Sequence, residues 1–311
     1  MPLWEKAALV LYKMDWIKED TSKEQDELNR DIDILIYNCV RPNTQISALD
    51  AAHAYIKEIT KKYPPPYTLM CSSGVDSQAM LWAWYTSGVP FICHNVKYIT
   101  DDIYFNSHDA KELITFTSIH NISVEYSIFD CVKFYNSPQY LKNARAYNCC
   151  SPQIGVYIKM VEDLPGTKIF GGNFIDPYKQ LSIDYTILGL KRYAEKSNDN
   201  VIPFFFLGDQ NLAFAFYETE KNVLSTTSTY DRKCVTYQQC GFPVIPQETK
   251  FTGFEKIKDY YDEHYSKDIT AADKLYAATK PSKRTHDVIL RYRTNRLLGD
   301  NMPKLQWVIS Y

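Results

Sequence analysis

Glycine is scarce in this chain, since only 11 of its 311 residues are glycine, so each position that carries one is informative. The chain also lacks an apolar run that approaches the length of a membrane span, which argues against a membrane partner. A large excess of positive or negative side chains is absent as well. With 35 lysines and arginines against 37 aspartates and glutamates, a generally basic surface for nucleic acid is not expected.

A secretory signal is also not apparent. Glu5 and Lys6 precede a short apolar run near the N-terminus, and no cleavage-site pattern follows. Eight cysteines without such a signal favour reduced thiols or metal ligands in a cytoplasmic protein.

The length of the chain predicts a main domain with appendages, because a single core is near its practical limit at 311 residues. We expect an N-terminal helical segment over 1–62, a main domain over 63–200 and an α-rich substrate or accessory region over 201–311. Within the first segment, 18–33 holds seven acids and three bases, which we interpret as a solvated helix face. Apolar residues at helical spacing predict a second helix over 46–62.

The main domain begins with a strand, a small-residue turn and a helix. Three prolines end the preceding segment, 67–71 reads as a short apolar strand, and helix character runs from Asp76 to near Gly88. We call the intervening residues 72–77 the serine loop. A helix N-terminus after such a turn binds phosphate through free backbone N–H groups, and Gly74 lets the backbone approach the anion.

Side chains of the serine loop add to this prediction. Ser72, Ser73 and Ser77 could supply hydroxyl donors. Asp76 by itself would repel phosphate, so we expect a second role for it, as a metal ligand or as a helix cap that faces solvent. No lysine follows Gly74, which excludes a P-loop of the Walker type. An ordinary capped turn is the alternative.

Strands and helices then alternate along the chain. After the first pair we expect strands over 91–96, 122–129 and 168–170, and helices over 103–120 and 151–164. This alternation predicts an α/β fold with a doubly wound, mostly parallel, Rossmann-like sheet whose first strand is central. Ligands bind such sheets at the carboxyl ends of the strands.

The serine loop resembles the Ser-Gly-Gly-x-Asp-Ser loop of the PP-loop ATP pyrophosphatases, in the adenine-nucleotide alpha-hydrolase superfamily. Ser72, Gly74, Asp76 and Ser77 match that pattern, and Ser73 stands where the family usually has its first glycine. The turn after the fourth strand, Gly171-Gly172-Asn173-Phe174-Ile175-Asp176, is similar to the family's Gly-x-Asn-x-x-Asp turn. A plain glycine turn is the alternative there.

The resemblance implies that ATP binds with its phosphates on the serine loop, Val75 included, and that Gly171, Gly172 and Asn173 also contact this cofactor. It places the adenine near Val96. It implies Mg²⁺ on Asp76 and Asp176, and catalytic roles for Asp76, Ser77, Lys97 and Asp176. Lys159 and Lys179 are further candidates for phosphate contact, only because they lie near these motifs in the sequence.

The implied reaction cleaves ATP between the α- and β-phosphates, giving AMP and pyrophosphate. A small-molecule or nucleobase acceptor would be adenylated and then amidated or thiolated. The sequence leaves the acceptor open. A non-catalytic nucleotide-binding protein is an alternative function.

A pair of cysteines before the 151–164 helix, Cys149 and Cys150, resembles the sulfonucleotide (PAPS/APS) reductase branch of the superfamily. The resemblance implies a [4Fe–4S] cluster completed by Cys234 and Cys240, which here are separated by five residues rather than two. The alternatives are structural zinc or four reduced cysteines. A sulfonucleotide-binding oxidoreductase is therefore a further candidate function, and we expect the four cysteines to lie near one another.

The last third of the chain carries weaker signals. We expect a strand over 201–207, helices over 209–220 and 254–265, and an extended segment over 241–246. The tail over 280–304 has seven bases and two acids. It could contact a phosphate-bearing substrate or nucleic acid, but a solvated helix is the more common role of such a run.

Overall fold

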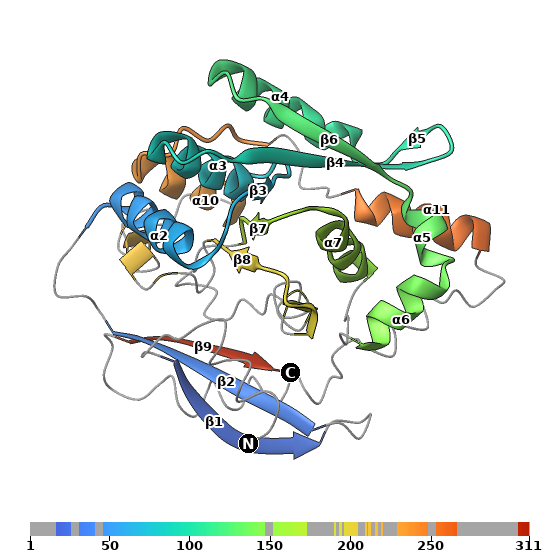
Figure 1. Ribbon diagram of the computed structural model, residues 1–311, viewed down its shortest axis with the longest axis horizontal. Coiled ribbons are helices and arrows are strands. Elements are labelled where there is room, and N and C mark those ends of the chain that lie inside the picture. The colour runs from blue at the N-terminus through green and yellow to red at the C-terminus, as the bar shows by residue number, and fades with distance from the viewer. Residues whose placement is uncertain are drawn as a thin grey trace.

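A computed structural model describes residues 17–25, 31–40, 46–146, 152–172, 196–204, 229–247, 253–265 and 304–310, with scattered positions between 190 and 219. Its larger sheet contains six strands (Figure 1). They are β3 (Tyr67–Met70), β4 (Ile92–Thr100), β5 (Ile103–Tyr104), β6 (Val124–Phe129), β7 (Thr167–Phe170) and β8 (Val201–Pro203).

The larger sheet is parallel except for its short strand β5. β3 pairs in parallel with β4 and β7, β4 with β6, and β7 with β8, whereas β5 folds back antiparallel on β4. The spatial order β6-β4-β3-β7-β8 is that of a Rossmann-like sheet. The predicted α/β fold and the central position of the first strand are thus confirmed.

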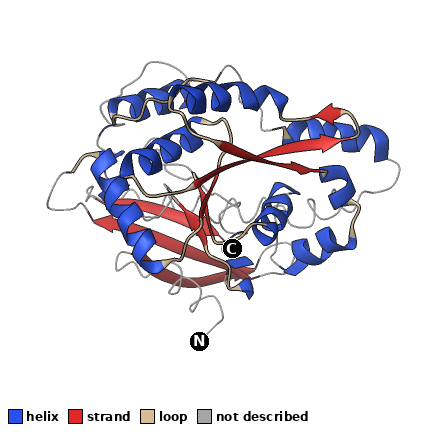
Figure 2. Cartoon of the chain, turned by 45° about the horizontal axis from the view of Figure 1, so that its top comes forward, coloured by secondary structure: helices blue, strands red, loops and turns tan. Residues whose placement is uncertain are grey.

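Helices cover both faces of this sheet (Figure 2). Leu69 belongs to a buried cluster on one face, and its neighbour Met70 belongs to a second cluster on the other. The first cluster is lined by α2 (Ala48–Lys62), α3 (Val75–Ser87), α4 (Ala110–Ile119) and α10 (Thr229–Gln239). The second is lined by α5 (Cys131–Tyr135), α6 (Pro138–Ala146), α7 (Pro152–Asp163) and α11 (Phe254–Tyr265).

The N-terminal segment differs from its predicted helical form. The helix expected over 46–62 is confirmed as α2, which begins where the Ser47 hydroxyl accepts the Asp50 N–H. The helix face expected over 18–33 is wrong. Those residues lie in and between β1 (Ile17–Gln25) and β2 (Asp31–Val40), which form an antiparallel sheet with β9 (Lys304–Ser310). Strand pairing with the far end of the chain overrides the local charge pattern.

The segment after β4 also differs from expectation. The helix predicted over 103–120 begins only at Ala110, because Ile103 and Tyr104 form β5 and a 3-10 turn, η1 (Ser107–Asp109), follows. Asn106 fixes this change of direction, donating to the Val96 carbonyl and accepting the Tyr98 N–H. Helix α11 matches the prediction over 254–265.

Three predictions concern larger parts of the chain. The domain boundaries stay a prediction. The strand β8 begins at Val201, just after the boundary expected at residue 200. In the described part of the chain, every helix is too short or too polar to span a bilayer. A cytoplasmic location stays a prediction.

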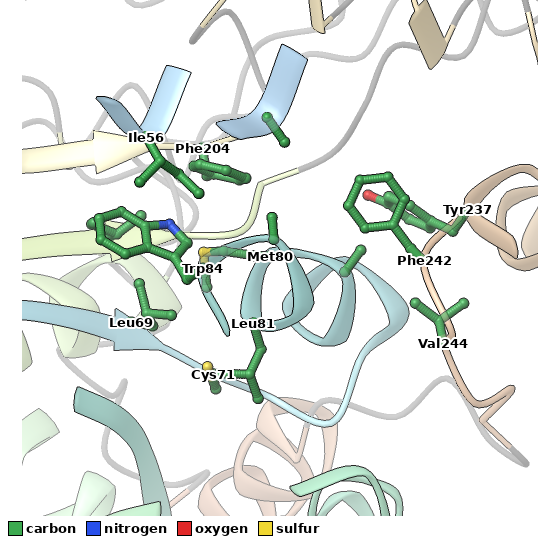
Figure 3. Close-up of a cluster of buried hydrophobic side chains, with 14 of the residues drawn as sticks. Ile56, Leu69, Cys71, Met80, Leu81, Trp84, Phe204, Tyr237, Phe242 and Val244 are labelled. Atoms are coloured by element: carbon green, nitrogen blue, oxygen red, sulfur yellow. The ribbon is translucent and has the colours of Figure 1, made fainter. Parts of the chain in front are cut away.

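Helix α3 is the centre of the first cluster (Figure 3). Trp84 is fully buried and lies against the rings of Tyr67 and Phe204, at centroid distances of 5.3 and 6.4 Å. These neighbours come from β3 and from the residue after β8. The apolar side of α3 is therefore fixed against the sheet, and with it the start of the helix.

We expect Trp84→Ala to lower the free energy of unfolding by about 3–5 kcal/mol, because it leaves a cavity in this cluster. Trp84→Phe should cost less, since it keeps a ring in place and removes a buried indole N–H that has no hydrogen-bond partner. Ile119→Ala, at an exposed residue of α4, is the control and should change stability by about 0.5 kcal/mol or less. Denaturant titration measures all three. Equal losses of stability in Trp84→Ala and Ile119→Ala would contradict the burial of Trp84 in the first cluster.

Candidate functional site

The serine loop connects the carboxyl end of β3 to the start of α3, as predicted. The first N–H groups of α3 have no intrahelical acceptor, as in any helix. The N-cap residue, Gly74, has no side chain that could accept from them. Along the loop, Ser72 is exposed and Gly74 and Asp76 are half-buried, whereas Ser73, Val75 and Ser77 are buried. The loop thus presents one hydroxyl, a glycine and the helix start outward.

Hydrogen bonds inside the loop hold its shape. The Ser77 hydroxyl accepts the Ser72 N–H at 3.1 Å and lies 3.0 Å from the Ser72 hydroxyl. The Gly74 N–H donates to the Ser72 hydroxyl at 3.2 Å. From β4, the Asn95 amide donates to the Cys71 carbonyl at 2.8 Å. Ser77 therefore closes the loop on itself, and the Ser72 hydroxyl lies between the Ser77 hydroxyl and the Gly74 N–H.

Ser73, at the position where the resembling family has glycine, is tied to the C-terminal region. Its hydroxyl accepts a hydrogen bond from the Gln247 amide at 2.7 Å, and its carbonyl accepts one from Gln78 at 2.7 Å. Gln78 also exchanges two hydrogen bonds with the backbone of Ile245, at 2.7 and 3.1 Å. We call residues 242–247 the cover segment, because this extended stretch is fastened over the buried side of the serine loop.

Asp76 is engaged by α10. Its Oδ2 forms an ion pair with the Lys233 ammonium, and its Oδ1 accepts a hydrogen bond from the Tyr237 hydroxyl at 2.6 Å. The side chains of Lys233 and Asp76 are 18% and 22% exposed. Asp76 is therefore only partly exposed to solvent, because a helix from the last third of the chain packs against it.

The turn after β7 touches the serine loop. Gly171 approaches α3 so closely that a Cβ atom placed on it would lie 3.3 Å from the backbone carbonyl of Asp76 and 3.4 Å from the Ser77 nitrogen. Gly172 has a φ of 66°, a conformation that favours glycine. The two predicted glycines are thus beside the loop, whereas Asn173, Asp176 and Lys179 lie outside the described residues.

Other predicted site residues on β4 and α7 have partners of their own. Val96 is buried in the second cluster near the carboxyl end of β4. The Lys97 ammonium lies 4.5 Å from the centroid of the Tyr126 ring, a cation–π contact. Lys159 forms an ion pair with Asp163 within α7. Their roles toward a ligand stay predictions.

The predicted cluster cysteines are only half described. Cys149 and Cys150 lie outside the described residues, so their proximity to the other pair stays a prediction. Cys234 is buried in the first cluster, and burial raises the pKa of the Cys240 thiol to about 11. In the part of the chain that the structure describes, no three histidine, cysteine or acidic side chains gather as metal ligands would.

Sequence reasoning missed Lys233, Tyr237 and Gln247, which all contact the serine loop. Their partners are 157, 161 and 174 residues away along the chain. No local pattern around them marks a site. The hydrogen bonds of Gln78 and Gln247 depend on where the cover segment lies, so the sequence did not predict them.

This chain has a Rossmann-like α/β fold in which the serine loop connects the central strand β3 to α3. No protein-family model matches it, and no curated protein does. Among solved structures, it is similar to U34-tRNA thiolase NcsA from Methanococcus maripaludis, determined with its [4Fe–4S] cluster. The identity is 13%, the match covers 78% of this chain and 84% of that one, and the TM-score is 0.27. A similarity this low adds no argument on function.

The contact between Gly171 and α3 gives a prediction about the local order of the site. We expect Gly171→Ala to cost about 1–3 kcal/mol of stability, because the added methyl group presses on the first turn of α3. Amide hydrogen exchange should rise at residues 75–77. Gly155→Ala in α7 is the control, because its added methyl group presses on the Tyr140 ring in the second cluster. It should cost stability without raising exchange at residues 75–77. Unchanged exchange at the start of α3 in Gly171→Ala would count against the contact.

Proposed function

We propose that this protein binds ATP on the serine loop and cleaves it to AMP and pyrophosphate while adenylating an acceptor. One observation carries the proposal. The serine loop begins α3 at the carboxyl end of β3, where the order of the sheet reverses between β3 and β7, and Gly171 from the β7 side touches it. Open parallel sheets bind ligands at that point, and a helix N-terminus there favours an anion.

Each part of the loop has a task in this proposal. The first N–H groups of α3 and the Ser72 hydroxyl donate to phosphate oxygens. Gly74 lets the phosphates approach the loop backbone because it has no side chain. Gly171 lets the turn after β7 lie against the first turn of α3. Ser77 and Asn95 hold the loop in shape through the hydrogen bonds described above. Val96, near the carboxyl end of β4, remains the proposed neighbour of the adenine.

The proposed chemistry is a displacement at the α-phosphate. An acceptor oxygen attacks the α-phosphorus, the bond to the bridging oxygen breaks, and pyrophosphate leaves with its electron pair. The acceptor is then an AMP ester that an amine or sulfur nucleophile can open. The N–H groups at the start of α3 stabilise negative charge that develops on the phosphates, because they are oriented before the reaction begins.

The described residues do not fit a preformed magnesium site. Both carboxylate oxygens of Asp76 already accept from Lys233 and Tyr237. Asp176, the second predicted ligand, lies outside the described residues. A magnesium ion at Asp76 would have to compete with these two partners. Magnesium at Asp76 and Asp176 stays a prediction, and so does an iron–sulfur cluster. Nucleic acid as a partner through the basic tail over 280–304 is not favoured.

The proposal is tested by incubating the purified protein with ATP labelled at the α-phosphate, Mg²⁺ and a metabolite pool. We expect labelled AMP or an adenylated product. Gly74→Val should lower its formation by about 100-fold, because a bulky side chain displaces the phosphates. Lys61→Gln, which removes an exposed ion pair on α2, is the control and should keep full activity.

Three outcomes would contradict the proposal. Labelled ADP would mean that the reaction occurs at another phosphate. ATP binding without turnover would favour a non-catalytic nucleotide-binding protein. Full activity of Gly74→Val would separate the reaction from the serine loop.

A further inference from the structure

The ion pair between Lys233 and Asp76 places a positive charge at the start of α3. Asp76 is the second residue of α3, so the ammonium lies beside the first turn of that helix. Tyr237 donates to the other carboxylate oxygen from one turn further along α10. Both members of the pair keep some exposure, which leaves the ammonium within reach of a ligand on the loop.

The backbone that carries Lys233 is firmly held. Its neighbours Cys234, Thr236 and Tyr237 are all buried. The Tyr237 ring packs against Phe216 and Phe242, with centroids 5.2 and 5.9 Å away. Figure 3 shows Tyr237 and Phe242 together at the α10 side of the cluster that surrounds α3. Core packing thus sets the position of the Lys233 backbone, and the ion pair with Asp76 orients its side chain.

Charge explains why this placement matters. A carboxylate in the first turn of α3 would repel a phosphate bound to the same N–H groups. The Lys233 ammonium offsets that charge. An ammonium has three N–H donors, so it can keep Asp76 as a partner and still donate to a phosphate oxygen.

We propose that Lys233 is the phosphate-contacting cation of the serine loop, in the place of the lysine that a Walker loop would supply. This inference rests on the proposed function and names a ligand class for the site, the pyrophosphate group of a nucleotide. Lys233 differs from other lysines near the sheet because its acidic partner belongs to the serine loop. Lys97 lies over an aromatic ring, Lys159 pairs within α7, and Lys168 is 2% exposed and pairs with Asp199.

The inference is tested by titrating inorganic pyrophosphate and ATP into the protein in EDTA, with calorimetry as the readout. Lys233→Gln should weaken pyrophosphate binding by about tenfold or more, because it removes a charged donor and leaves Asp76 uncompensated. Asp76→Asn should bind at least as tightly as the wild-type protein, since it removes a repelling charge. The double variant should bind more weakly than the wild-type protein, because it lacks the donor ammonium, but more tightly than Lys233→Gln, which keeps the repelling carboxylate. Lys61→Gln is the matched control and should bind like the wild-type protein.

Thermal melts establish that each variant is folded, and the double variant has a neutral pair in place of the ion pair. A purely structural ion pair predicts that the double variant binds pyrophosphate like the wild-type protein, and this result would overturn the inference. Wild-type binding that needs Mg²⁺ would also overturn it, because the metal would then supply the charge. If the wild-type protein binds neither ligand with or without Mg²⁺, the proposed function itself is wrong.

Discussion

The parallel pairing of β3 with β7 is the constraint on which the site depends. Met70 pairs with Phe170, so the two strands end at the same level and the residues that follow enter the same space. The serine loop leaves one strand there and the two glycines leave the other. The backbone contact between Gly171 and Asp76 is a direct result of this register. Burial of α3 against the sheet then determines where its N–H groups point.

The site also needs the last third of the chain. Helix α10 neutralises Asp76, and the cover segment satisfies Ser73 and Gln78 through hydrogen bonds that a shorter chain would leave unmade. Ser73 shows how a departure from glycine is accommodated. Its side chain is buried, and its hydroxyl accepts a hydrogen bond from the Gln247 amide.

Much of the larger sheet could be predicted from the sequence, because short apolar runs bounded by proline and glycine mark β3, β4 and β7. The turn at residues 72–77 could also be predicted, since a run of small polar residues between a strand and a helix is typical of a tight turn. The hairpin of β1 and β2 was not, because its charged residues favour a helix until β9 provides a pairing edge. Lys233 and Gln247 could not be found, since their partners are set by tertiary packing. Asn173, Asp176 and the Cys149–Cys150 pair remain predictions.

The separation along the chain between the serine loop and its supports affects how the protein acquires its structure. The contacts of Asp76 and Ser73 join residues 157 to 174 positions apart. Contacts of such long range form slowly, because a large loop must close before they contribute. During synthesis the strands around β3 emerge well before α10 and the cover segment. Asp76 therefore lacks its partners until the ribosome has made α10, and Gln78 lacks its partner until the cover segment follows.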